Sequence, residues 1–377
     1  MKSSFIIVSH TRFNEKGGAV HGTASELAPF LEKKKKSYIY IQHSLFYGTG
    51  TNIIISNTRR KKARKYGFTF LPFPLRILQE YIITLYFVSK IRSNSLTYIG
   101  IDPLNAWLGI ILKKFGRVKK VIFYTADYAH NRYHNNFMNS LYHWFDKFCI
   151  KRADQIWNVS SRITELRKKQ GVADTKNFFV SNAPIIRSNH LVLKNKKVHQ
   201  LIIVTHITKA IDFNSILFAI QTVRKRYKDI KLFIVGNGEY RSKLEEKVRK
   251  MSLIDQVVFT GSLNHEEVMK LLSESGVGLA LYTNDFPWTK YGDSMKAREY
   301  LAHGLPVIIN DIPSTADDIK KAHAGIVISS GKKIVDAIEY LFSNKKDYTV
   351  MKNNALALAK KSDFFHTVER TKFLTFS

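Results

Sequence analysis

The chain has 377 residues, of which 45% are hydrophobic and 12% aromatic, so it can bury a core and is not disordered throughout. Lysine and arginine number 60 against 30 aspartate and glutamate, and the resulting charge of +30 favours anionic partners such as nucleic acid, lipid headgroups or phosphorylated substrates. The single cysteine, Cys149, excludes an internal disulfide framework, and its apolar neighbours predict a buried thiol.

Short apolar segments alternate with helical ones along the first half of the chain. Phe5–Val8 predicts a strand, because a secretory signal needs an apolar run of roughly 7–15 residues. No uncharged stretch reaches the roughly 18–20 residues of a membrane span. We expect further strands at 38–41, 52–55, 68–70, 96–99, 121–124 and 155–159, and helices at 19–31, 76–92, 103–115, 139–151 and 163–169. This alternation predicts a parallel sheet covered by helices on both faces.

The same alternation begins again after a polar, basic segment at residues 187–200. We therefore expect two tandem Rossmann-like, doubly wound α/β domains. Their expected bounds are 1–185 and 186–355, and a C-terminal helix at 356–377 is expected to pack back on the first domain. Ligands of such sheets bind beyond the carboxyl ends of the strands.

Residues 292–309 predict a loop, a short helix, a Gly-Leu-Pro stop and a buried strand. Ser294 lies where the helix begins, and exposed backbone N–H groups at a helix start bind anions. Lys296 adds a positive charge in the first turn, and the Glu299 carboxylate could accept bonds from sugar hydroxyls. This stretch predicts a pocket for a phosphorylated, hydroxyl-rich ligand.

Glycines follow several of the predicted strands. Each group can be a plain turn, or it can let the backbone approach a ligand closely. Their common position at strand ends favours one shared cleft. The groups are Gly17 with Gly18, Gly236 with Gly238, and Gly261 with Ser262 and Leu263.

A polar cluster follows a strand of the first domain. Its side chains suit the recognition of hydroxyl or carboxylate groups, or proton transfer. A metal site built from Asp127, His130 and His134 is the alternative, although no other residues have metal-ligand spacing. The cluster consists of Asp127, Tyr128, His130, Arg132, Tyr133 and His134.

Basic runs at 33–36, 59–65 and 194–197 lack the interleaved aromatic residues of a platform that stacks nucleic-acid bases. They indicate either a solvated surface or contact with an anionic membrane. The predicted helix at 76–92 is apolar on more than one face, which is typical of a buried helix. Docking onto a membrane is the alternative for this helix.

In this order, the residues resemble the GT-B glycosyltransferases, and within them the family 4 nucleotide-sugar enzymes. The resemblance spans almost the whole chain. Its strongest parts are Gly236-Asn237-Gly238 and residues 258–261 and 296–308, and Asn182 matches the asparagine that commonly closes the first domain of that family. It implies an N-terminal acceptor domain, a C-terminal donor domain and a cleft between them. It also implies retention of anomeric configuration, with no metal and no cofactor besides the nucleotide-diphosphate sugar that serves as donor substrate.

The resemblance also implies roles for individual residues. Asp127, Lys296 and Glu299 would act in catalysis, with Lys296 stabilising the leaving diphosphate. The acceptor would be bound by Asp127, Tyr128, His130 and Arg132. The donor would be bound by Gly17, Gly18, His206, Lys209, Gly236, Gly238, Gly261, Ser262, Leu263, Asp293, Ser294, Met295, Lys296 and Glu299.

The sequence departs from the family pattern at three places. Tyr291 stands where the first glutamate of the usual E-x7-E pair would be, so only Glu299 remains. His206 and Lys209 are the available substitutes for the arginine and lysine that normally follow the first strand of the second domain. Asp127 stands where many relatives carry a histidine near the reacting sugar.

We therefore expect a glycosyltransferase that moves a sugar from a nucleotide-diphosphate sugar to a hydroxyl group. A lipid-linked or cell-surface saccharide is the expected acceptor, in polysaccharide biosynthesis, and the expected location is the cytoplasm, at the inner face of the cell membrane. A sugar-nucleotide epimerase would use the same donor pocket without an acceptor. A basic nucleic-acid-binding protein would owe its affinity to charge and would need none of the pocket motifs, so we expect no nucleic-acid partner.

Overall fold

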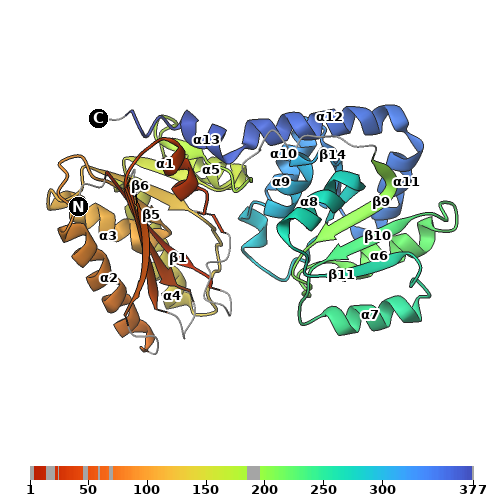
Figure 1. Cartoon of the computed structure of the whole chain (residues 1–377), viewed down its shortest axis with the longest axis horizontal. Coiled ribbons are helices and arrows are strands. Elements are labelled where there is room, and N and C mark those ends of the chain that lie inside the picture. Colours follow the sequence, from red (N-terminus) through yellow and green to blue (C-terminus); the bar gives the residue numbers. More distant parts are fainter. Residues whose placement is uncertain are drawn as a thin grey trace. The chain divides into compact units, whose positions relative to one another are not determined.

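The computed structural model describes residues 4–13, 22–23, 25–45, 50–57, 60–67, 71–184 and 196–375. The chain forms two compact units: unit 1 contains residues 1–180 and 368–377, and unit 2 contains residues 181–367. Each unit is an α/β structure built around its own sheet (Figure 1). This confirms the expected fold class of two doubly wound α/β domains.

The sheet of unit 1 has the strand order β4-β3-β2-β1-β5-β6-β7-β8. Strands β1, β2 and β5 to β8 are parallel, but β3 and β4 pair antiparallel at one edge. The connections before β3 and β4 are too short for the crossover that a parallel strand requires, so both strands extend the sheet as hairpins. The strands are β1 (Phe5–Thr11), β2 (Tyr38–Ser44), β3 (Thr51–Ser56), β4 (Lys61–Tyr66), β5 (Thr97–Ile101), β6 (Lys120–Thr125), β7 (Gln155–Asn158) and β8 (Asn177–Phe179).

The basic run at 59–65 is exposed where the structure describes it, which agrees with the solvated surface that the sequence predicted as one alternative. Most of it forms β4, an edge strand whose side chains at 61–65 are exposed. Charged side chains on an edge strand discourage pairing with other chains. The strand predicted at 68–70 lies outside the described residues.

Five helices lie within the described residues of unit 1. Ser160 caps the last of them, as predicted, because its Oγ accepts a hydrogen bond from the Ile163 amide at 3.2 Å. In the described part of the chain, no helix combines the length and the apolar character needed to cross a membrane. The helices are α1 (Leu27–Lys33), α2 (Phe73–Ser89), α3 (Pro103–Lys114), α4 (Asn136–Arg152) and α5 (Ser161–Lys169).

One core of unit 1 lies between the sheet and α2, α3 and α4. Ile6 and Val8 of β1 point into this core, while Phe5 points to the other face, where its ring contacts Phe373. Cys149 is buried, as predicted, and its Sγ donates to the Pro103 carbonyl at 3.3 Å. Burial raises the pKa of this thiol.

The sheet of unit 2 is entirely parallel in its described strands, in the order β11-β10-β9-β12-β13-β14. Buried residues separate into one core with α6, α7 and α11 and a second core with α9, α10 and α12. Figure 1 shows α7 on one side of these strands and α8, α9 and α12 on the other. The strands are β9 (Lys197–Val204), β10 (Lys231–Val235), β11 (Val257–Gly261), β12 (Ser275–Ala280), β13 (Val307–Asn310) and β14 (Gly325–Ile328). The helices are α6 (Phe213–Val223), α7 (Arg241–Lys250), α8 (His265–Glu274), α9 (Met295–Ala302), α10 (Thr315–Ala322), α11 (Ile334–Ser343) and α12 (Lys345–Ser362).

The C-terminal segment is divided between the units, which differs from the expected return of residues 356–377 as one piece. Helix α12 packs on unit 2, where it buries Ala355 and Ala359. Helix α13 (Phe364–Arg370) follows, and only residues 368–377 belong to unit 1.

Candidate active site

Helix α9 begins and ends as residues 292–309 predict. The Oγ of Ser294 caps its first turn by accepting from the Ala297 amide at 3.2 Å. Gly304 has a φ of +62°, and the Leu305 amide bonds back to the Tyr300 carbonyl at 3.0 Å. This ends the helix in the manner typical of glycine and sends the chain into β13.

The residues just before α9 hold the helix in place. Asp293 is buried, and its carboxylate accepts from Arg298 Nε at 3.0 Å, from Thr315 Oγ1 at 2.7 Å and from the Asn182 amide at 3.1 Å. Ser294 is bonded to Tyr282, with 2.6 Å between the hydroxyl oxygens. The side chains of Asp293 and Ser294 are therefore engaged within the protein, and the Ser294 amide, which the sequence predicted as an exposed N–H group, donates to Thr315 Oγ1 at 2.7 Å.

Lys296 lies in the first turn of α9 and reaches the end of β9. Its Nζ donates to Thr205 Oγ1 at 2.5 Å. Removal from solvent lowers the pKa of the Lys296 ammonium to about 8, so the charge is retained at neutral pH but is poorly solvated. An anion placed here would restore the lost solvation.

Glu299 lies one turn further along the same face of α9. Among the described residues its carboxylate has no hydrogen-bond or ion-pair partner. Burial raises the pKa of this carboxyl group. Likewise, no described residue accepts a hydrogen bond from the amides of Met295 and Lys296, as is normal for the first turn of a helix. Unit 2 thus brings together two free amides, a cation and a free carboxylate.

The glycines of Gly236-Asn237-Gly238 are required by close packing. Gly236 has a φ of +128°, and a Cβ there would lie 1.9 Å from the Thr205 carbonyl oxygen. A Cβ on Gly238 would lie 2.3 Å from the Ile207 carbonyl oxygen. The two glycines therefore allow the backbone after β10 to pack against the backbone after β9. The Lys296 ammonium reaches the same place, where it bonds to Thr205.

The other residues predicted to bind the donor follow the carboxyl ends of strands in the unit 2 sheet and make few contacts. His206 and Lys209 are exposed, and His206 Nε2 lies 3.2 Å from a carboxylate oxygen of the equally exposed Glu239. Ser262 is also exposed and accepts from Asn237 Nδ2 at 3.3 Å. Gly261 ends β11 with a φ of +72°, and Leu263 is half-buried. Gly17 and Gly18 lie outside the described residues.

The acceptor cluster of unit 1 is only partly brought together. Asp127 and Arg132 form an ion pair, and the Tyr128 ring is buried, with the Arg167 guanidinium 5.5 Å from its centre. His130 is exposed. Of these four, Arg132 lines a pocket and the other three do not. In the described part of the chain no group of His, Cys, Asp and Glu side chains could hold a metal ion.

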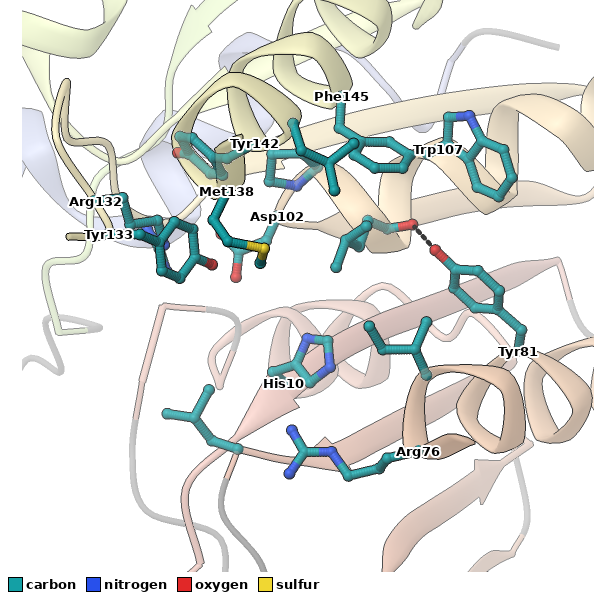
Figure 2. Close-up of a pocket in the computed structure, with 15 residues that line it drawn as sticks. His10, Arg76, Tyr81, Asp102, Trp107, Arg132, Tyr133, Met138, Tyr142 and Phe145 are labelled. Carbon is teal, nitrogen blue, oxygen red and sulfur yellow. Dashed lines mark hydrogen bonds between the residues drawn. The ribbon is translucent and has the colours of Figure 1, made fainter. Parts of the chain in front are cut away.

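That pocket has a volume of about 500 Å³ and lies between α2, α3 and α4, at the carboxyl ends of β1 and β5. Figure 2 shows His10 and Arg76 on one side of it, Arg132 and Met138 on the other, and Asp102 between them. The rest of its wall is largely apolar: Leu45, Ile77, Tyr81, Pro103, Leu104, Trp107, Tyr133, Leu141, Tyr142 and Phe145.

Residues 187–357 match the family described as glycosyl transferases group 1. The matched residues lie within unit 2. The whole chain also superposes on a solved Anabaena protein, HepE in complex with UDP, with a TM-score of 0.68 and 11% identity over 100% of this chain and 99% of that one. This likeness establishes the GT-B fold for both units of the chain.

Two characterised relatives share part of the sequence. Chitobiosyldiphosphodolichol beta-mannosyltransferase of Candida albicans is 25% identical over 210 residues, which are 52% of this chain and 44% of the relative. Alpha-monoglucosyldiacylglycerol synthase of Streptococcus pneumoniae is 24% identical over 111 residues, which are 29% of this chain and 25% of the relative. The chain therefore matches less than half the length of either relative.

Sequence reasoning missed two polar residues that line the pocket of unit 1, His10 and Asp102. His10 lies near the end of β1, and Asp102 directly follows β5, so their position at a carboxyl end is a signal that was present. Aspartate followed by proline at the start of a predicted helix is typical of a helix cap. Because a cap explains Asp102 without a ligand, the sequence gives no separate reason to assign this residue to a site. In the structure, however, the Asp102 side chain makes no cap hydrogen bond.

Proposed function

We propose that the protein transfers a sugar from a nucleotide-diphosphate sugar to a hydroxyl acceptor. The observation that carries this proposal is the start of α9, where Lys296 and two free amides can bind a diphosphate. Glu299, on the same helix face, has a carboxylate available to ribose hydroxyls. As the leaving diphosphate gains charge, the lysine and the amides would stabilise it without rearrangement.

A thermal-shift screen with UDP-, GDP- and ADP-sugars tests the donor. A ligand at 100 times its dissociation constant stabilises the native state by about 2.7 kcal/mol, which gives a clear rise in melting temperature. We expect one nucleotide class to produce this rise in the wild type. If no nucleotide sugar does so, the donor assignment is wrong.

Lys296→Ala and Glu299→Ala test the residues. Each should lower turnover at least roughly 100-fold, because each removes a charged contact to the donor. Lys250→Ala, at an exposed lysine on α7, is the matched control and should keep wild-type turnover. Wild-type turnover in both site variants would overturn the placement of the diphosphate.

Two finer expectations about the chemistry belong to the same proposal: the sugar keeps its anomeric configuration, and no metal takes part. Proton NMR of the product during the first turnovers reads the configuration directly. Addition of EDTA should leave the rate unchanged. An inverted product or a rate abolished by EDTA would refute the corresponding expectation.

The acceptor is proposed to be membrane-anchored because α2 has an exposed apolar stripe. Its buried face includes Glu80, Thr84, Phe87 and Val88, which pack on the sheet side. Large apolar residues with the spacing i, i+3, i+7, i+10 and i+11 lie on the solvent face, each between 43% and 57% exposed: Leu75, Leu78, Ile82, Leu85 and Tyr86. Soluble surfaces rarely expose such a contiguous stripe.

A second stripe and a basic strand support the same surface. Phe137, Leu141 and Trp144 are exposed on α4, at the spacing i, i+4 and i+7. Strand β4 packs beside α2, where Tyr66 contacts Phe87 with 5.3 Å between ring centres, and it presents four exposed lysine and arginine side chains. Apolar residues beside basic ones suit an anionic bilayer surface.

Vesicle flotation tests this surface. The wild type should float with anionic vesicles at low salt and less at high salt, because salt screens the attraction between basic side chains and anionic lipids. Leu78→Gln with Ile82→Gln should reduce flotation, whereas Ile254→Gln, at a 64% exposed position in unit 2, should not. Absence of flotation together with dimer formation by the wild type would show that a second copy covers the stripe.

A further inference from the structure

Asp102 is the one pocket residue that is unusual in both its backbone and its side chain. It has φ 71° and ψ 159°, a region that non-glycine residues rarely occupy, and it immediately precedes Pro103. Its Oδ1 is buried and has no hydrogen-bond partner among the described residues. The carboxylate accepts a backbone hydrogen bond from Ala126, which leaves only Oδ1 without a partner. Because the backbone conformation and the unpaired oxygen both cost stability, the position suits a group from outside the chain.

The other charged groups of the pocket are satisfied within the protein. His10 has Nε2 3.0 Å from Glu80 Oε2 and Nδ1 3.2 Å from Asn105 Nδ2. Arg76 Nε lies 3.4 Å from the same Glu80 carboxylate, and Arg132 pairs with Asp127. Each guanidinium is thus already matched by a carboxylate, so these arginines offer little excess charge to an anionic ligand.

A hydroxyl group is the ligand that Asp102 suits. An ionised carboxylate accepts hydrogen bonds strongly, and a neutral O–H donor adds no charge that the matched arginines would have to balance. The Tyr142 hydroxyl also lacks a partner in the described residues, but in Figure 2 it points away from the other labelled side chains.

The pocket wall beside Asp102 is aromatic, so the ligand that carries the hydroxyl group should also have an apolar part. Tyr81 stacks on Trp107 with 5.9 Å between ring centres, and Trp107 meets Phe145 edge to face at 5.6 Å. The Tyr81 hydroxyl is directed to the Leu104 carbonyl at 3.3 Å, so the wall shows its ring faces rather than its polar group. Such a surface binds an alkyl chain or another flat apolar group.

We propose that this pocket is the acceptor site, that Asp102 binds the reacting hydroxyl, and that the acceptor is an uncharged amphiphile whose apolar part lies on Trp107 and Phe145. The proposal rests on the proposed function, and it goes beyond it in naming the binding residue and the acceptor class. The hydroxyl O–H donates to the Asp102 carboxylate, which fixes the direction of its oxygen lone pairs. The apolar part holds the molecule at the depth where that bond forms.

Acceptor binding should then depend on pH. Three charged or titratable groups surround Asp102: Asp127 and Arg132 from the loop after β6, and His10 from β1. Burial, followed by repulsion from Asp127, raises the pKa of Asp102 to about 6. The carboxylate is therefore ionised at neutral pH and protonated below pH 6, where the charged acceptor of the hydrogen bond is lost.

Calorimetric titration with n-octyl β-glucoside below its micelle concentration and with methyl β-glucoside tests the ligand class. Both have the same sugar hydroxyls, and they differ in apolar length. The octyl compound should bind at least roughly 10-fold tighter to the wild type, because several methylene groups become buried. Equal affinities would overturn the apolar part of the proposal.

Asp102→Asn tests the binding residue in the same titration. It should weaken octyl glucoside binding roughly 10-fold at pH 7.5 and abolish the loss of affinity below pH 6, without lowering the melting temperature. Asp174→Asn, an exposed carboxylate in unit 1, is the matched control and should behave as wild type. Unchanged affinity in Asp102→Asn, or a merely lower melting temperature, would overturn the assignment.

The acceptor test stays separate from the donor test. Octyl glucoside titrations need no donor, and UDP binding to unit 2 needs no acceptor. If no nucleotide binds but octyl glucoside still does so through Asp102, the proposed transfer fails and the pocket assignment stands. In assays with the donor, Asp102→Asn should raise the KM for the acceptor more than it lowers kcat.

Discussion

At the scale of single residues, the pair Asp293 and Arg298 determines where α9 can begin. Both side chains are almost fully buried, and Arg298 also pairs with Asp318 of α10. When one partner of a buried carboxylate–guanidinium pair is removed, the other is left as an uncompensated buried charge, which destabilises the fold. The pair therefore fixes the first turn of α9, and with it Lys296, without touching a ligand itself.

Asp293→Ala should lower the free energy of unfolding of unit 2 by about 3–5 kcal/mol, because it leaves the Arg298 charge buried without its main partner. Urea unfolding followed by circular dichroism measures this loss. Glu246→Ala, which removes an exposed i, i+4 partner of Lys250 on α7, should have little effect. Equal effects of the two substitutions would contradict the role given to Asp293.

Lys296 should make stability depend on pH. Its pKa of about 8 in the folded protein lies below the ordinary value of 10.5, so between these values the unfolded chain holds more protons than the folded one. The free energy of unfolding contributed by this group therefore rises with pH from about 8 to about 10.5. Lys296→Met should show a smaller rise over this window in urea unfolding at a series of pH values.

The difference between wild type and variant isolates Lys296 from other lysines, such as Lys196, whose pKa burial also lowers. Lys209→Met, at an exposed lysine of the same unit, should follow the wild-type curve. Parallel curves for wild type and Lys296→Met would show that Lys296 is well solvated in the folded protein.

At the scale of elements, the site of unit 2 depends on how closely three strand ends approach each other. The Gly236 amide donates to the Gly261 carbonyl at 2.8 Å, and the Thr205 amide donates to the Val235 carbonyl at 2.8 Å. These bonds hold the ends of β9, β10 and β11 together. A side chain at Gly236 would separate them and displace Thr205, the partner of Lys296.

Gly236→Ala should therefore destabilise unit 2 by more than roughly 1 kcal/mol and also weaken donor binding. The matched control is Gly261→Ala: its φ is also positive, at +72°, but the nearest atom to its added Cβ lies at 3.4 Å. Both variants bear backbone strain, and only Gly236→Ala adds an overlap with backbone. Thermal melting with and without the nucleotide found in the screen compares them; equal losses would show that the overlap is relieved elsewhere.

At the scale of the whole molecule, the chain returns to unit 1 at its C-terminal end. Phe373 is buried against the rings of Phe5, Phe30 and Trp157, and the Thr371 carbonyl accepts from Gln155 Nε2 at 2.9 Å. The last residues therefore complete the core of unit 1, although the preceding residues belong to unit 2.

Phe373→Ala should lower the free energy of unfolding of unit 1 by about 3–5 kcal/mol, the usual cost of a large cavity. Tryptophan fluorescence reports it, because Trp157 lies 5.0 Å from the Phe373 ring. Phe115→Ala, at a 76% exposed position in the same unit, should change little. A wild-type transition in Phe373→Ala would show that the C-terminal residues add no stability to unit 1.

The sequence by itself determined the alternation of strands and helices, the fold class and the limits of α9. These features follow from local patterns, because apolar periodicity, a capping serine and a terminating glycine depend only on residues close together in the sequence. It also placed Lys296 and Glu299 on one helix face, because residues three apart on a helix are neighbours.

Only the tertiary structure decided which polar side chains are free. Asp293 and Ser294 read as ligand groups in the sequence, yet their partners, Arg298, Thr315 and Tyr282, are supplied by folding. No pattern in the sequence singled out Asp102, and only its surroundings in the fold show an oxygen without a partner among the described residues. The hydrogen bonds and the burial of a side chain depend on residues that are distant in the chain, so local sequence patterns cannot predict them.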